Sequence, residues 1–208
     1  MFSRQKAKLY ALEAATLLSL GVAGCAEAPP AKAVPEAKAV LRGVALYLPL
    51  EDNSVLAYET TNTEEQKGFL AVQITRKGGG LVELKAGEKS QMLEVAGDSV
   101  RHVSGGLLLK WPLATGDTFP GEFATVRVVT TDRAIQVPAG SFKACVETLE
   151  AATEGPLQQQ SRKVFCPNVG LVFFENQVSR GSEVNSQTAA LRSFGPKIDV
   201  FAEPDPAH

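Results

Sequence analysis

Short runs of alternating apolar and polar residues occupy most of the chain from about residue 43 onward. Residues 70–75, 124–129 and 142–147 show the clearest alternation, with apolar side chains at every second position. A period of two places one set of side chains on each face of a β-strand. The pattern predicts strands at residues 44–48, 54–61, 70–75, 81–85, 90–96, 99–104, 106–111, 124–129, 133–137, 142–151, 158–166, 171–178 and 186–194.

Turn-forming residues separate these predicted strands and indicate how the strands pair. Lys77–Gly80, Gly97–Asp98 and Pro138–Gly140 are rich in the residues that turns favour. The intervals are too short for the crossovers that parallel strands need, so we expect an antiparallel meander. Because more than about ten strands rarely stay in one flat sheet, the meander should curl or split. The predicted fold class is mainly β: a strongly curved sheet, half-barrel or two-layer sandwich that follows an N-terminal signal helix.

Two of the predicted strands carry apolar residues on both faces. Leu107–Trp111 and Leu171–Phe174 contain few polar positions. Strands of this kind are covered on both sides, and the cover is either protein or a bound ligand. The aromatic residues are spread over nearly every predicted strand. They fit either the core of a β-domain or the walls of an apolar groove.

The N-terminal segment has a different organisation, with basic, apolar and small residues in that order. Three basic residues between positions 4 and 8 precede a mostly apolar stretch at residues 9–22, and small residues then lead to Cys25. This order is typical of a secretory signal. The apolar stretch is too short to span a bilayer comfortably as a permanent helix. The alternative is an ordinary N-terminal helix that ends at a buried cysteine.

The end of this segment, Val22-Ala23-Gly24-Cys25, resembles the lipobox of bacterial lipoproteins. The resemblance implies cleavage before Cys25 and attachment of lipid to this cysteine, and two or more acyl chains hold a protein stably on a membrane. Ala26 follows, where lipoproteins retained at the inner membrane have aspartate, and this favours the outer membrane, facing the periplasm.

The expected organisation of the chain has four parts. Residues 1–24 are the lipoprotein signal peptide, and residues 25–42 form an Ala/Pro-rich tether that holds a domain off the membrane. Residues 43–195 form the all-β domain. Residues 196–208 form a proline-containing, loosely ordered tail.

Composition and charge narrow the choice of partners. The 208 residues are 44% hydrophobic and 21% charged, which suits a domain with a buried core. Removal of residues 1–24 takes away three basic side chains and one acidic one, so the formal charge falls from −2 to −4. An acidic domain gives no electrostatic reason to expect nucleic acid as a partner or simple adhesion to anionic lipid headgroups.

Cys145 and Cys166 are the remaining cysteines, and an oxidising compartment outside the cytoplasm would let them pair. Their midpoint falls between Gly155 and Pro156, at the centre of the turn between two predicted strands. In a regular hairpin folded there, the cysteines lie directly opposite each other, at a separation that a disulfide spans. The sequence therefore predicts a disulfide worth about 3 kcal/mol by loop entropy. The alternative, a redox-active dithiol, usually has closely spaced cysteines at a helix start.

Candidate metal ligands and catalytic groups are few. His102 and His208 are the only histidines in the sequence, and neither stands in the spacing of a zinc site. The acidic residues Glu147 and Glu150 are expected to be solvated charges rather than an acid/base pair. No metal ligand, cofactor or catalytic residue is predicted.

One motif resembles a catalytic block. Gly97-Asp98-Ser99, with His208 at the other end of the chain, resembles blocks of the GDSL-type hydrolases. Those enzymes place the serine on a strand-to-helix turn of a parallel α/β fold, whereas strand alternation surrounds Ser99. Gly97-Asp98 also favours a β-turn, and we interpret the block as a turn.

Three stretches resemble a family of uncharacterised bacterial envelope lipoproteins. They are the Y-x-P-L opening at Tyr47–Leu50 with the strand that follows, the stretch Leu109–Phe119, and a pair made of V-P-A-G-x-F at 137–142 with Cys145 and C-P-x-V-G-L-V at 166–172. The resemblance implies a shared fold and location. Members of this family are generally without an assigned activity.

These features support two functional hypotheses. The first is a lipid-anchored, non-enzymatic envelope module that binds another envelope protein or has a structural role. The alternative is a periplasmic carrier or binder of an apolar, lipid-like ligand in the hollow of a curved sheet. In both cases the protein contacts the membrane through lipid on Cys25, and nucleic acid is not a partner. A large apolar cavity would favour the alternative, whereas a filled core would favour the first hypothesis.

Overall fold

Twelve antiparallel strands form one continuous sheet in the computed structural model, which describes residues 41–197. Strands that follow one another in the sequence pair with each other, except β6 and β7, which form the two edges of the sheet. In addition, β1 pairs with β12. The strands are β1 (Ser54–Asn62), β2 (Lys67–Gly78), β3 (Leu81–Ala86), β4 (Lys89–Ala96), β5 (Ser99–His102), β6 (Leu107–Lys110), β7 (Thr118–Pro120), β8 (Thr125–Val137), β9 (Gly140–Glu154), β10 (Leu157–Cys166), β11 (Gly170–Arg180) and β12 (Glu183–Pro196). The predicted mainly β, antiparallel meander is confirmed.

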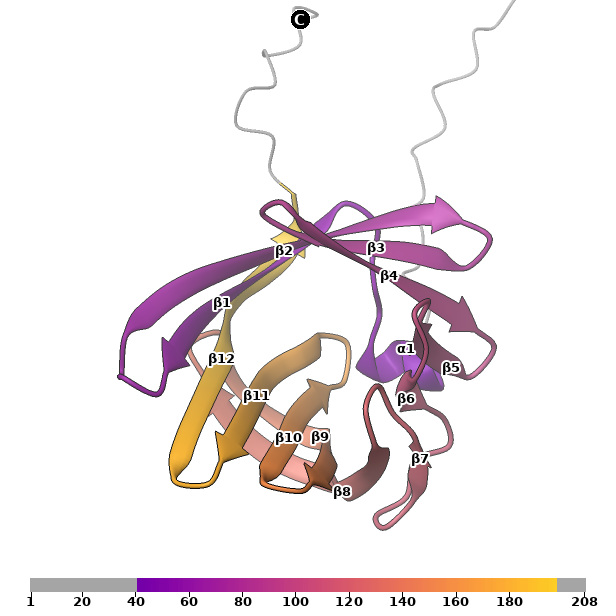
Figure 1. Cartoon of the computed structure of the whole chain (residues 1–208). Helices are drawn as coiled ribbons and strands as arrows, with labels where there is room; N and C mark the ends of the chain where they lie inside the picture. Colours follow the sequence, from indigo (N-terminus) through magenta and orange to yellow (C-terminus); the bar gives the residue numbers. More distant parts are fainter. Residues whose placement is uncertain (1–40, 198–208) are drawn as a thin grey trace, which may run out of the picture. The chain divides into compact units, whose positions relative to one another are not determined.

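The sheet curls until it is nearly closed and barrel-like (Figure 1). The twist between neighbouring strands accumulates over a long sheet and turns it towards itself. The edge strands β6 and β7 approach each other at the end of this path. The predicted curling of the sheet is therefore confirmed, and it creates the concave face on which the candidate site lies.

The segment before β1 is helical where the sequence predicted a strand. Residues 44–48 were expected to be extended, but Val44–Tyr47 form a short helix, α1. The backbone N–H of Leu48 donates to Val44 O at 2.9 Å, and both of these side chains are buried. Apolar residues four apart also share one face of a helix, so a short apolar run does not distinguish the two structures. Figure 1 shows α1 inside the curve of the sheet.

The strands predicted at 124–129 and 133–137 fall almost wholly in one strand, β8, and β9 extends at both ends beyond the strand predicted at 142–151. The pairing between β8 and β9 shifts register at three places between Val128 and Ile135, and such bulges bend a strand. The bent end of this hairpin packs on the outer face of the sheet, where Ala139 N–H donates to Leu191 O at 2.8 Å. The three-residue strand β7 was not predicted, because it is too short to show alternation.

Apolar residues pack on both faces of the sheet. The inner cluster includes Leu93, Leu109 and Phe165, all fully buried, and α1 contributes to it. The outer cluster, defined here as Val137, Cys145, Cys166 and Val172, lies under the β8–β9 end. The prediction that apolar strands are covered on both sides is confirmed for Leu171–Phe174: Val172 belongs to the outer cluster, whereas Leu171 packs against the inner one.

The hairpin of β9 and β10 has the predicted register. Glu154 pairs with Leu157 at the turn, and Val146 pairs with Phe165 eight residues farther along each strand. Continuation of this register brings Cys145 opposite Cys166, and the structure joins them by a disulfide. Both cysteines are fully buried in the outer cluster.

Several sequence-based predictions fall outside the described residues. They concern the signal peptide at residues 1–24, the lipidation site Cys25, most of the tether at 25–42, and nearly all of the tail at 196–208. Within the described range 41–197, no helix is long and apolar enough to cross a membrane.

Candidate functional site

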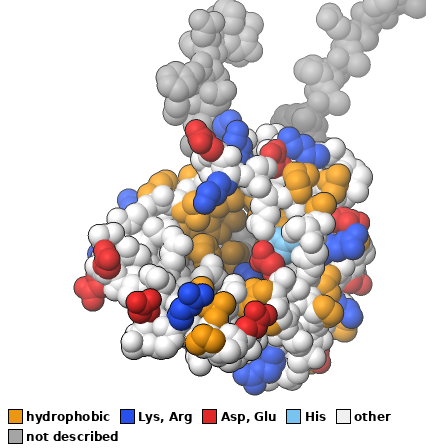
Figure 2. Space-filling view, in the orientation of Figure 1, with side chains coloured by type: hydrophobic (Ala, Val, Ile, Leu, Met, Phe, Trp, Pro, Cys, Tyr) orange, Lys and Arg blue, Asp and Glu red, His pale blue; other side chains and the backbone are white. Residues whose placement is uncertain are grey.

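A cavity of about 770 Å³ lies on the concave side of the sheet. Figure 2 shows it as a hollow with hydrophobic side chains in its walls. Its volume is within the range of about 300–1,000 Å³ that is usual for ligand pockets. Most of its lining residues are apolar: Leu48, Leu50, Leu56, Tyr58, Leu70, Val72, Ile74, Leu84, Ala86, Leu93, Leu108, Phe123, Phe165, Leu171 and Phe174.

β1 and β2 supply a large part of the apolar wall. Leu56 pairs directly with Val72, and Tyr58 pairs directly with Leu70. Because every second residue of a strand points to the same face, the alternation predicted for residues 70–75 places these side chains together on the concave face. The pattern that predicted the strand thus also builds the wall of the cavity.

Tyr58 anchors this wall to β11. Its side chain is buried, and its hydroxyl donates to Leu171 O at 2.8 Å. Burial disfavours the charged phenolate and raises the pKa of Tyr58 well above its usual value of 10. The side chain therefore stays neutral and hydrogen-bonded in the folded protein.

Replacement of Tyr58 by phenylalanine is expected to lower the free energy of unfolding by about 1 kcal/mol, because the Leu171 carbonyl loses its donor. In the wild type, Tyr58 ionises in the unfolded chain near pH 10 but stays neutral when folded, so its contribution is present below about pH 10 and is lost above it. Urea unfolding at about pH 8 and pH 11 should show a steeper alkaline loss in the wild type than in the variant. Equal losses would contradict this role.

Polar residues also line the cavity, and three of them lie on β10. β10 alternates Gln159, Ser161 and Lys163 towards the cavity, and Phe165 continues the same face into the inner cluster. Ser161 is buried, and Lys163 is half-buried. One strand thus changes from polar to apolar along the cavity, which gives the hollow a polar side and an apolar side.

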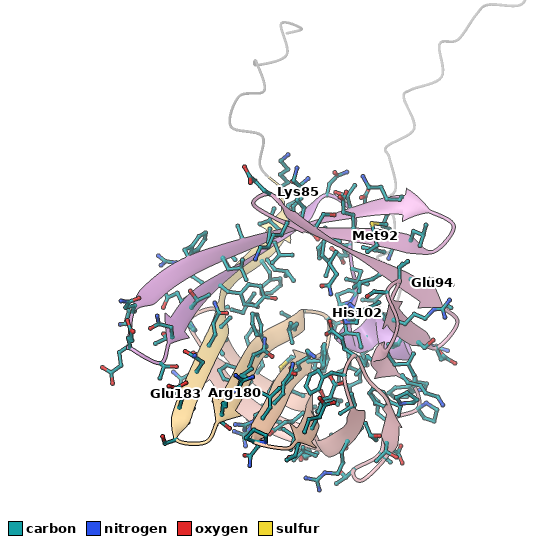
Figure 3. The ribbon with its side chains drawn as sticks, viewed as in Figure 1. Lys85, Met92, Glu94, His102, Arg180 and Glu183 are labelled. Carbon is teal, nitrogen blue, oxygen red and sulfur yellow. A yellow bond between two sulfur atoms is a disulfide. The ribbon has the colours of Figure 1, made fainter. Side chains whose placement is uncertain are left out.

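His102 on β5 lies at the same polar side, and Figure 3 shows it at the inner face of the curved sheet. Its ring is buried, and Gln91 Nε2 lies 2.8 Å from Nδ1. When the Gln91 amide donates to Nδ1, the ring proton is on Nε2, which lies 3.9 Å from Glu122 Oε2. Burial, with a smaller contribution from Lys163, lowers the pKa of His102, although the Glu122 and Glu150 carboxylates oppose the shift. The ring is therefore neutral at pH 7.

Lys163 is a cation without a close partner. Within residues 41–197, no hydrogen-bond acceptor lies within bonding distance of Nζ, and no carboxylate oxygen lies within 4.0 Å. Burial lowers the pKa of Lys163, and the more distant carboxylates of Glu150 and Glu122 partly oppose this shift. An anion that entered the cavity would stabilise the ammonium group.

Glu150 fixes the loop before β8, and it is not the solvated charge that was predicted. Its side chain is 2% exposed. Oε1 accepts hydrogen bonds from the backbone N–H groups of Phe123, at 2.7 Å, and Ala124, at 2.8 Å. A side chain at Gly121 would collide with this carboxylate, so glycine is required there. The loop carries Glu122 and Phe123 to the cavity.

Glu147 was also predicted to be solvated and is buried. Its carboxylate accepts from Arg162 Nε at 2.7 Å, and Arg133 Nε lies 3.4 Å from its second oxygen. Two guanidinium groups offset the cost of burying this charge. Since Glu147 and Glu150 are an odd number of residues apart on β9, they face opposite sides of the sheet.

The residues that form the polar side of the cavity were not predicted as a site. His102 had no predicted role, and Lys163 was not among the candidate residues. The available signal was the alternation of Gln159, Ser161, Lys163 and Phe165, which marks one face of a predicted strand. The turn predicted at Gly97-Asp98 is present. Within residues 41–197, no group of three or more His, Cys, Asp or Glu side chains is placed to hold a metal ion.

Comparisons with known proteins give similarity in outline only. No protein-family model and no curated protein sequence matches the chain. A protein from Bacteroides fragilis, described as exported and as having a YmcC-like fold, is 10% identical with a TM-score of 0.46, over 72% of this chain and 99% of that one. A protein from Parabacteroides distasonis, described as a lipoprotein, is 10% identical with a TM-score of 0.45, over 74% of this chain and all of that one.

Proposed function

We propose that this protein is a non-enzymatic binding protein of the bacterial cell envelope that holds a lipid-like ligand in the hollow of its curved sheet. The observation that carries the proposal is the cavity of about 770 Å³ with mostly apolar walls. A filled core would have favoured a purely structural module. In an open apolar cavity, by contrast, binding is favourable because an apolar group replaces the water in contact with the walls.

The location is part of the same proposal. The lipobox Val22–Cys25 supports cleavage before Cys25 and lipid on that cysteine. Ala26 supports the outer membrane, with the domain in the periplasm. The proline-rich tether supports a domain held away from the bilayer, where its cavity can exchange a lipid-like ligand with the membrane or with another envelope protein.

Binding of N-phenyl-1-naphthylamine, an uncharged dye that fluoresces in apolar surroundings, tests the cavity. The full chain with Cys25→Ser, which cannot be lipidated, is expected to bind the dye saturably. Leu70→Glu is expected to weaken binding by about tenfold or more, because it places a charge in the apolar wall. Fluorescence titration measures both affinities.

Ala71→Glu is the matched control. Ala71 is the next residue on β2, is exposed and does not line the cavity, so the same charge there should leave dye binding unchanged. The proposal fails if the chain shows no saturable binding. It also fails if both glutamate variants bind the dye as the parent chain does.

A further inference from the structure

The cavity combines an apolar wall with a charged group that has no close partner. Lys163 lies on the cavity-facing side of β10, between Ser161 and the buried Phe165. Within residues 41–197, Nζ makes no hydrogen bond and no ion pair shorter than 4.0 Å. A half-buried ammonium group of this kind has lost part of its hydration, and nothing in the described protein replaces it.

The nearby acidic groups do not neutralise Lys163 by direct contact. The oxygen Oε1 of Glu150 is held by two backbone N–H groups of the loop before β8. Glu122 is half-exposed at the cavity, and its closest cationic or imidazole partner is His102, at 3.9 Å. Both carboxylates act on Lys163 only at longer range, so the position next to the ammonium group is left for a ligand.

The charges that line the cavity favour an anion. Lys89 and Lys163 are the lining cations, Glu122 is the lining carboxylate, and His102 is neutral at pH 7. The lining therefore has one positive charge in excess, although the whole chain has a formal charge of −2. Figure 2 shows basic and acidic side chains at the edge of the hollow and hydrophobic side chains in its walls.

We propose that the ligand is an amphiphile whose anionic head, a carboxylate or a phosphate, binds Lys163 while its apolar tail lies against the wall formed by β1 and β2. This inference rests on the proposed function and adds the chemistry of the head. A charge-assisted hydrogen bond from an ammonium to an anionic oxygen is about twice as strong as a neutral one. The polar side of the cavity thus selects the head, and the apolar side binds the tail without selecting it.

Displacement of N-phenyl-1-naphthylamine from the Cys25→Ser chain by palmitoyl compounds tests the inference. The probes are palmitate, palmitoyl lysophosphatidylglycerol, uncharged monopalmitoylglycerol and inorganic phosphate. At least one of the two anionic palmitoyl probes is expected to displace the dye at about tenfold lower concentration than monopalmitoylglycerol. Comparison of the two anionic probes identifies a carboxylate or a phosphate head, and inorganic phosphate, which lacks a tail, should not displace the dye.

Variants of Lys163 assign the preference to this residue. Lys163→Met is expected to remove the preference, so that in this variant the anionic probes and monopalmitoylglycerol displace the dye at concentrations within about twofold of one another. Lys163→Arg should retain the preference. Lys67→Met, which removes an exposed lysine that does not line the cavity, is the matched control.

The outcomes separate this inference from the proposed function. Dye binding without a preference for either anionic probe, or with a preference that survives Lys163→Met, overturns the inference and leaves the proposed function standing. Failure of the parent chain to bind the dye overturns the proposed function. Circular dichroism checks the fold of each variant. If Lys163→Met does not fold, the parent's own preference and its retention in Lys163→Arg decide the matter.

Discussion

Replacement of Glu150 by alanine is expected to lower the free energy of unfolding by about 3 kcal/mol. The wild-type carboxylate is buried and accepts hydrogen bonds from the backbone N–H groups of Phe123 and Ala124. The alanine variant leaves both groups without this acceptor and opens a space next to Gly121, whose backbone lies against the carboxylate. Urea unfolding at neutral pH, followed by circular dichroism, measures the loss.

Two further variants isolate the cause. Glu150→Gln keeps an oxygen in place but removes the charge, so its expected loss is about 1 kcal/mol. Glu154→Ala removes an exposed glutamate farther along β9 and is expected to change stability by less than about 0.5 kcal/mol. If Glu150→Ala were as small in effect as Glu154→Ala, the carboxylate would not support the loop.

The role of Glu150 also links stability to the candidate site. The loop that it fixes carries Glu122 and Phe123, and both residues line the cavity. A protein that uses this cavity needs the loop in one position, because preorganised walls reduce the cost of binding. Burial of a carboxylate costs free energy. For Glu150 this cost is offset by the hydrogen bonds that it accepts from two backbone N–H groups.

The burial of the two glutamates could have been predicted from strand phase. Val146 is fully buried, and Glu150 is four residues later on the same face of β9. Glu147 is likewise in phase with the buried Cys145. The prediction was wrong because it judged each side chain by its charge, which usually means exposure, and did not extend the alternation of the strand through the acidic positions.

Local pairing could be predicted from the sequence, but the cavity could not. A short turn fixes the register of a hairpin, so the pairing of β9 with β10 followed from residue numbers alone. The cavity depends on the pairing of β1 with β12, which are separated in sequence by most of the domain and join the two meanders into one sheet. Alternation predicts which face of its own strand Lys163 or Leu70 occupies. Only the curvature of the sheet brings both side chains to the walls of one cavity.

The second large effect is expected when the disulfide is removed. The double variant Cys145→Ala/Cys166→Ala, made in the Cys25→Ser chain, should unfold with a free energy lower by about 3 kcal/mol, because the bond restricts the unfolded chain. The double replacement avoids an unpaired buried thiol. Urea unfolding of the variant is compared with that of the oxidised parent chain and of the parent chain in reductant, and the reduced parent should also be less stable than the oxidised one.

A thiol count decides whether the bond is present. The denatured Cys25→Ser chain contains only Cys145 and Cys166, so it should show no titratable thiol before reduction and two after it. Two thiols in the unreduced protein would contradict the disulfide. The bond also lies where β9 begins to leave the sheet: Ala144, next to Cys145, has a positive φ of 54°, and Arg133 pairs with Cys145 across a bulge. Loss of the bond should therefore loosen the β8–β9 end over the outer cluster first, and hydrogen exchange should rise there before it rises in β1 and β2.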